Sequence, residues 1–164
     1  MPEITVLGRN HDRAGFDCGV PELNAFLRAT ARQHQQKGIS RTFVLAENGN
    51  ATILGFFTLT LCEVQPIELP ATVSRHYPTH HLPAVRLARL AVSRKEQGKR
   101  FGGLLLSEAL YRTRLIAEQA GLIGLFVDAK NDSARRFYLR YGFLSLIGQP
   151  LQLFLPIATI RTVS

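Results

Sequence analysis

The chain has 164 residues and a formal net charge of +8. A chain of this length can bury a sizeable core, so we expect residues 1–164 to form one domain. Two cysteines do not make a disulfide framework, and the polar start of the chain lacks the apolar segment of a signal peptide, which predicts a cytoplasmic protein. The positive charge suits an anionic partner, either a nucleic acid or a phosphate-rich cofactor, although it would equally serve solubility alone.

The first half of the chain predicts a helix followed by a hairpin. Pro21 suits the first turn of a helix, and apolar side chains recur on one face from there to residue 32. Strands are predicted over 42–46 and 53–61, joined by a turn at 47–50 that contains Asn48-Gly49, a strong hairpin signal. Residues 63–83 are rich in proline and histidine and predict a long irregular segment, a kind that often carries function.

The second half alternates strands and helices. We predict a strand over 85–92, a helix over 102–120, a strand over 122–127 and a short helix that begins at Asn131 or Asp132 and ends at Arg140. The uncharged stretch 141–160 is nominally long enough to cross a membrane, but its glycines and prolines favour a buried hairpin of strands 143–147 and 151–155. The element order predicts a mixed α/β domain.

The loop between the strand at 85–92 and the following helix is a candidate anion site. It reads Gln97-Gly98-Lys99-Arg100-Phe101-Gly102-Gly103, and the N–H groups at the start of a helix attract anions. It is not a Walker A loop, because Arg100 stands where Ser or Thr is required, and it is not a G-x-G-x-x-G fingerprint. Taken alone, a simple turn between strand and helix explains the pattern equally well.

A second motif lies downstream, where Ala134, Phe137, Tyr138, Gly142 and Phe143 form the pattern A-x-x-F-Y-x-x-x-G-F. Together with Gln97 and Gly102 it resembles the GNAT N-acetyltransferase superfamily, although Arg100 stands where that family mostly has glycine. The resemblance narrows to the TacT-like GNAT toxins of bacterial toxin–antitoxin pairs. It is carried by Phe16-Asp-Cys-Gly19, Leu23-Asn-Ala-Phe-Leu27, Ser40-Arg-Thr-Phe-Val44, Leu87-Ala-Arg-Leu-Ala-Val92 and Gly124-Leu-Phe-Val127.

The resemblance implies a single GNAT domain that transfers an acetyl group from acetyl-CoA to the α-amino group of aminoacyl-tRNA and so blocks translation. It also implies a ribbon-helix-helix antitoxin and a homodimer, with no metal and no membrane. Two alternatives stay open. One is a GNAT enzyme that acetylates a small amine or a protein N-terminus. The other is a non-enzymatic RNA- or partner-binding protein on a GNAT scaffold.

The same resemblance implies the site residues. Tyr138 would protonate the departing thiolate, since tyrosine titrates near 10, close to a thiol. Backbone N–H groups of Leu90, Ala91 and Val92 would stabilise the oxyanion. Those of Gln97, Gly98, Lys99, Arg100, Phe101, Gly102 and Gly103 would hold the pyrophosphate, and Asn131 and Ser133 would face the pantetheine arm. The candidate tRNA contacts are Arg28, Arg32, Lys37, Arg41, Arg86, Arg89, Lys130 and Arg135. The histidines at 76, 80 and 81 lack nearby acidic or cysteine partners at ligand spacing, so no metal is expected.

Overall fold

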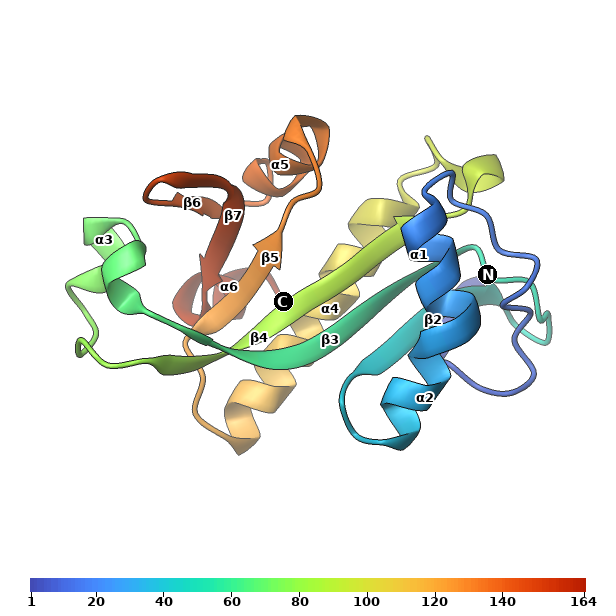
Figure 1. The fold of residues 1–164 in the computed structure, drawn as a ribbon, viewed down its shortest axis with the longest axis horizontal. Coiled ribbons are helices and arrows are strands. Elements are labelled where there is room, and N and C mark those ends of the chain that lie inside the picture. The colour runs from blue at the N-terminus through green and yellow to red at the C-terminus, as the bar shows by residue number, and fades with distance from the viewer. The chain divides into compact units, whose positions relative to one another are not determined.

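The computed structural model describes all residues from 1 to 164 (Figure 1). Its strands form a seven-stranded mixed sheet. The strand order is β1-β2-β3-β4-β5-β7-β6. β4 and β5 pair in parallel, whereas β1 with β2, β2 with β3, β5 with β7, and β6 with β7 are antiparallel. The strands are β1 (Pro2–Val6), β2 (Arg41–Glu47), β3 (Gly55–Val64), β4 (Leu82–Val92), β5 (Gly124–Asp128), β6 (Leu144–Leu146) and β7 (Gln149–Pro156). The mixed sheet with its helices confirms the predicted fold class.

The predicted helices are all present, with shifted ends. The first continues to residue 36 through a π-helical turn, η1. The helices are α1 (Pro21–Ala25), η1 (Phe26–Thr30), α2 (Ala31–Gln36), α3 (Ala71–Ser74), α4 (Phe101–Gln119), α5 (Asp132–Leu139) and α6 (Ile157–Val163), with short 3₁₀ turns η2 (Pro66–Glu68) and η3 (Arg94–Glu96). Sequence patterns did not predict β1 or α6, because each is too short to show a clear period. The segment 63–83, predicted as irregular, contains η2 and α3.

The chain forms two compact units, of which the first comprises Met1–Thr60 and Ala88–Ala109. Its core collects Phe16 and Cys18 from the opening motif with Phe26 and Leu27 of η1 and Phe56 of β3. The Phe16 and Phe56 rings lie edge to face with their centres 5.4 Å apart. The helical stretch α1–η1–α2 lies beside β2 in this unit (Figure 1). Apolar and polar residues alternate in the opening motif because Phe16 and Cys18 are buried in this core and Asp17 is exposed.

The second unit comprises Leu61–Leu87 and Leu110–Ser164. Its core includes Leu69, Val73, Phe126 and Phe154. The uncharged stretch 141–160 forms the β6–β7 hairpin and the start of α6, which confirms the predicted hairpin. None of the helices combines the length and the apolar character that a membrane span requires. Both cysteines are free thiols, one in each unit.

Candidate active site

The loop from residue 97 to 103 has the backbone of an anion site. The first hydrogen bond of α4 runs from the Leu104 N–H to the Arg100 carbonyl oxygen (3.3 Å), so the N–H groups just before it have no partner within the helix. Gly98 adopts a φ of 87°, and a Cβ atom placed there would meet nothing within 4 Å. The open space and the free donors at the positive end of a 19-residue helix fit a pyrophosphate.

Arg100 is the unusual residue of this loop. Its φ of 66° lies in the left-handed region, and it is the one residue other than glycine in the chain with a positive φ. This conformation costs a side-chain-bearing residue about 1 kcal/mol or more, which explains why a glycine is common at this place in the resembled family. Arg100 is exposed and makes no ion pair, whereas the Lys99 ammonium lies 2.7 Å from a Glu96 carboxylate oxygen. Arg100 is therefore the available cation of the loop.

Gln97 begins the loop but turns its side chain toward the protein. Its amide nitrogen donates to the carbonyl oxygens of Cys18 (3.2 Å) and Val92 (3.1 Å). Its backbone N–H lies 3.5 Å from the Arg94 carbonyl oxygen, at the limit of a hydrogen bond. Both amide hydrogens are thus used within the protein, so the side chain supports the loop and offers no free donor to a ligand. A hollow of about 190 Å³ lies beside this support, lined by residues that include Phe16, Asp17, Arg94 and Lys95.

Tyr138 lies in α5, a helix whose start is well determined by the sequence. The Asn131 side-chain oxygen accepts a hydrogen bond from the Ala134 N–H (2.9 Å), which caps the first turn. The Tyr138 ring is buried, with ring centres at 5.1 Å from Phe137 and 5.3 Å from Phe143. The motif A-x-x-F-Y-x-x-x-G-F is therefore partly a packing motif that fixes the tyrosine ring.

Burial raises the pKa of the Tyr138 phenol well above its ordinary value. The phenol consequently stays protonated at any physiological pH, as a proton donor must. It is also a weaker acid than the sequence predicted from an ordinary pKa near 10. Donation to a thiolate remains favourable only if the thiolate is desolvated as well, because burial raises the pKa of a thiol in the same direction.

The residues predicted to contact the oxyanion and the pantetheine arm lie at the end of β4 and the start of α5. Leu90, Ala91 and Val92 are the last residues of β4, and Ala91 is buried. Ser133 is exposed in the first turn of α5. The side-chain oxygen of Asn131 is used for the helix cap, which leaves its amide N–H groups for a ligand.

The basic candidates for tRNA contact differ in availability. Arg28, Lys37 and Arg41 are exposed. The candidates of the second unit are Arg86, Lys130 and Arg135, and the other candidates belong to the first unit. The Arg89 guanidinium lies over the Phe26 ring, 4.4 Å from its centre. In the second unit, Arg86 forms an ion pair with Asp128, and Arg135 donates to the Pro150 carbonyl oxygen (3.1 Å). The charges of Arg86 and Arg135 are therefore partly used within the protein.

The histidine-rich segment has an acidic neighbour that sequence spacing missed. The His81 Nδ1 atom lies 3.0 Å from a Glu63 carboxylate oxygen, 18 residues away in the chain. The sequence offers these histidines no acidic partner at ligand spacing, but the fold brings Glu63 at the end of β3 to His81 just before β4, because the two strands are neighbours in the sheet. No three His, Cys, Asp or Glu side chains gather closely enough to hold a metal ion.

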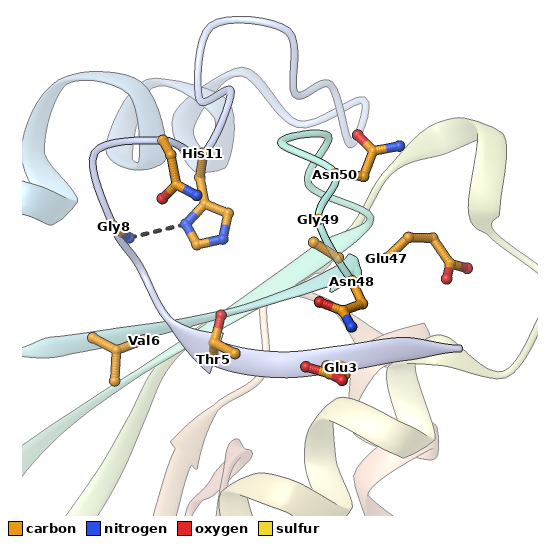
Figure 2. A pocket seen from close by; sticks show the side chains of 11 residues that line it. Glu3, Thr5, Val6, Gly8, His11, Glu47, Asn48, Gly49 and Asn50 are labelled. Carbon is orange, nitrogen blue, oxygen red and sulfur yellow. Dashed lines mark hydrogen bonds between the residues drawn. The ribbon is translucent and has the colours of Figure 1, made fainter.

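A polar hollow of about 320 Å³ lies in the first unit, apart from all the predicted site residues (Figure 2). β1, the loop that follows it and the turn between β2 and β3 line it, and His11 faces the turn residues Asn48–Asn50 across it. The His11 Nδ1 atom accepts a hydrogen bond from the Gly8 N–H (2.9 Å), and burial lowers the pKa of the imidazole. The neutral imidazole of His11 therefore holds the loop through this hydrogen bond.

Residues 12–143 match the model of the acetyltransferase (GNAT) family, and the chain belongs to that family. By class it is an acetyl-CoA-dependent N-acetyltransferase. The N–H groups without a partner at the start of α4 fit the pyrophosphate of that co-substrate. The chain is 36% identical over 152 residues to a "tRNA-acetylating toxin" from Mycobacterium tuberculosis, covering 93% of this chain and 90% of the relative. It is 33% identical over 161 residues to a "probable toxin TacT" from Sinorhizobium fredii, covering 93% and 89%.

Solved structures agree with this assignment. A tyrosine-to-phenylalanine mutant of KacT superposes with a TM-score of 0.94 at 30% identity and covers 99% of each chain. AtaT in complex with acetyl-methionyl-tRNA superposes with a TM-score of 0.92 at 30% identity, covering 99% of this chain and 98% of that one. AtaT has also been solved with the C-terminus of its antitoxin AtaR and acetyl-CoA, with a TM-score of 0.84 at 29% identity, covering 98% of this chain and 96% of that one.

Proposed function

We propose that this protein is a toxin that acetylates the α-amino group of aminoacyl-tRNA and thereby blocks translation. The observation that carries the proposal is its likeness, over nearly its whole length, to a tRNA-acetylating toxin and to AtaT bound to acetyl-methionyl-tRNA. The exposed basic residues Arg28, Lys37 and Arg41 support it, since an acceptor stem presents phosphates that such side chains bind without base readout. N-acetylation removes the nucleophilic amine, so the modified aminoacyl-tRNA no longer accepts a peptide.

Acetyl-CoA supplies an activated acetyl group as a thioester. In our proposal, the free N–H groups of residues 98–103 hold its pyrophosphate, and Arg100 adds a charge-assisted contact. Backbone N–H groups of Leu90–Val92 stabilise the oxyanion that develops on the acetyl carbonyl. Asn131 and Ser133 line the pantetheine side through their remaining polar groups.

Proton transfer requires little from the protein on the amine side. An α-amino group titrates near 7.7–8.0, so a useful fraction is already neutral at physiological pH and the released proton goes to water. The amine nitrogen forms the C–N bond to the acetyl carbon, and the C–S bond breaks as the resulting oxyanion collapses. The Tyr138 phenol gives its proton to the departing sulfur and regains a proton from the water that took up the proton of the amine. Burial makes the Tyr138 phenol a weaker acid, so this role requires the thiolate to leave in the same water-poor surroundings, where the pKa of the thiol is raised as well.

We further propose that the two compact units form one N-acetyltransferase domain over residues 1–164, acting in the cytoplasm as a homodimer. β3, β4 and α4 each continue from one unit into the other, which supports a single domain. A ribbon-helix-helix antitoxin would neutralise the toxin. The structures of AtaT bound to the C-terminus of its antitoxin AtaR support an antitoxin partner of some kind.

The test is a direct assay with purified protein, acetyl-CoA and total charged tRNA, followed by mass spectrometry of the released amino acids. We expect N-acetyl-aminoacyl products on a subset of tRNAs. Absence of such a product on every isoacceptor, with acetylation of a small amine or a protein N-terminus instead, would replace this function by the broader enzymatic one. Absence of any acetyl transfer would favour a binding protein on a GNAT scaffold.

A further inference from the structure

The opening motif and the acetyl-CoA loop are joined by hydrogen bonds within the first unit. The Gln97 side chain donates to the Cys18 carbonyl oxygen across 79 residues of chain, and also to Val92 at the end of β4. The Arg94 backbone N–H donates to the Asp17 carbonyl oxygen (2.8 Å), and the Arg94 guanidinium lies 3.7 Å from the Asp17 carboxylate. Residues 17 and 18 therefore contact both ends of the segment 94–97 that leads into the loop.

The turn that provides these carbonyl groups is itself fixed by side chains. One Asp17 carboxylate oxygen accepts from the Gly19 N–H (2.9 Å) and from the Asn24 amide (2.9 Å). The Asn24 side-chain oxygen in turn accepts from the Cys18 N–H (2.9 Å). Gly19 adopts a φ of 87°, which a larger residue would resist. The hydrogen bonds from Gly19 and Asn24 hold the pKa of Asp17 below its ordinary value, so the carboxylate is charged and committed to the turn.

We propose that the Asp17–Asn24 turn positions the acetyl-CoA loop and that Gln97 is the link between them. The inference rests on the proposed function only in assigning the loop to acetyl-CoA. The loop needs such a support because Gly98 and Arg100 are both in the left-handed region and the N–H groups from 98 to 103 have no partners that would hold them. N–H donors that are already ordered in the free protein lose less conformational entropy on binding, so the support raises the affinity for the anion.

This assignment changes the meaning of the opening motif. The motif is one of the segments that carry the resemblance to toxins that act on aminoacyl-tRNA. Its contacts place Asp17, Cys18 and Asn24 behind the cofactor loop, so Gln97 and Asn24 are positioning residues and do not touch the substrate in this account. The motif then affects affinity for acetyl-CoA, whatever amine is acetylated.

The test measures acetyl-CoA binding by isothermal calorimetry, without any acceptor. Gln97→Leu removes both donated hydrogen bonds. Because Gln97 is exposed, we expect a modest effect, a Kd about five-fold higher with little change in Tm. Gln97→Arg should restore most of the affinity, since a guanidinium also donates to two carbonyl groups. Gln119→Leu, at an exposed glutamine of α4 in the second unit, is the matched control and should leave the Kd unchanged.

A double-mutant cycle separates positioning from a general loss of structure. Asn24→Ala should also raise the Kd for acetyl-CoA. The double variant, Asn24→Ala with Gln97→Leu, should have a Kd within about two-fold of that of the weaker-binding single variant, because both changes act on the same support of the loop. In the transfer assay, the KM for acetyl-CoA should rise while kcat stays within about two-fold, a split that partial unfolding would not give.

An unchanged Kd in Gln97→Leu, failure of Gln97→Arg to restore binding, or multiplicative effects in the cycle would each overturn the inference. A wild-type protein that binds acetyl-CoA but does not acetylate charged tRNA would overturn the proposed function and leave this inference intact. A wild-type protein that does not bind acetyl-CoA at millimolar ligand would overturn both.

Discussion

The guanidinium carbon of Arg89 lies 4.4 Å from the centre of the Phe26 ring. Arg89 is half-buried in β4, and Phe26 belongs to the core of the first unit. A cation held over a buried aromatic ring is partly desolvated, so it contributes to stability as well as to the surface charge. The sequence predicted Arg89 only as a candidate tRNA contact, and the structure adds the packing role.

Replacing Arg89 by methionine should therefore lower the free energy of unfolding. The loss of the cation over the ring is expected to cost about 1 kcal/mol, measured by urea denaturation. Arg41→Met is the control, because Arg41 is exposed at the start of β2 and its change should cost less than about 0.5 kcal/mol. Equal losses in the two variants would contradict the contribution of the ring contact.

Arg100 should lower the stability of the fold and raise the affinity for acetyl-CoA. Arg100→Gly relieves a left-handed conformation but loosens the unfolded chain, so a net stabilisation of about 0.5 kcal/mol is expected. The same change removes the available cation of the loop and should weaken acetyl-CoA binding about three-fold or more.

Arg100→Asn and Arg100→Lys separate strain from charge. Asparagine tolerates the left-handed region without a charge, and lysine keeps the charge without the planar guanidinium. Calorimetry in low and high salt should show the affinity loss of Arg100→Asn shrinking as salt rises. Tighter binding by Arg100→Gly than by the wild type would mean that the side chain obstructs the ligand.

Tyr138→Phe should abolish most of the acetyl transfer while the fold is kept. Loss of a proton donor lowers kcat by about 10²–10⁴-fold, and the KM for acetyl-CoA should change little. Tyr141→Phe is the matched control, because Tyr141 is a more exposed tyrosine beside Phe137 in the same unit. If growth inhibition on expression persisted in Tyr138→Phe, Tyr138 would not be the acid.

The direction of the Tyr138 pKa gives a separate spectroscopic prediction. The chain has four tyrosines, and burial raises the pKa of this one above the ordinary value near 10. In an ultraviolet titration, the phenol that Tyr138→Phe removes should ionise above the ordinary value near 10. If the signal that Tyr138→Phe removes lay at or below pH 10, the burial of this phenol would be contradicted.

His11 should make stability depend on pH below neutrality. Burial lowers the pKa of the folded imidazole below 6.5, so the unfolded chain takes up a proton first as pH falls. The contribution of His11 to stability is therefore present above pH 6.5 and decreases as pH falls through the folded pKa. His11→Gln should lose less stability than the wild type between pH 7.5 and 5, as measured by denaturant unfolding at each pH.

His80→Gln is the control for that measurement. His80 is exposed, so the same histidine-to-glutamine change at this position controls for the general effect of replacing a histidine. The result that would count against His11 is an identical pH dependence in His11→Gln and the wild type.

Much of the local structure could be predicted because its signals are local. The Asn131 cap, the Asn48-Gly49 turn and the apolar stripe of α4 each lie within a few residues of the element that they define. β1 and α6 were missed because a short element at a chain end depends on its neighbours more than on its own pattern. The roles of the predicted site residues, Tyr138 foremost, stay predictions until the assays are done.

The sequence by itself determined the family and the two motifs, because the residues that carry them stand at fixed short spacings around Gly102 and Tyr138. Only the tertiary structure decided how those motifs are supported. The hydrogen bonds from Gln97 to Cys18 and from His81 to Glu63 join distant parts of the chain, and the burial of Tyr138 depends on Phe143 and its surroundings. Such contacts arise from the close packing of elements that no local pattern encodes, which is why the left-handed Arg100 and the raised pKa of Tyr138 appear only in the folded protein.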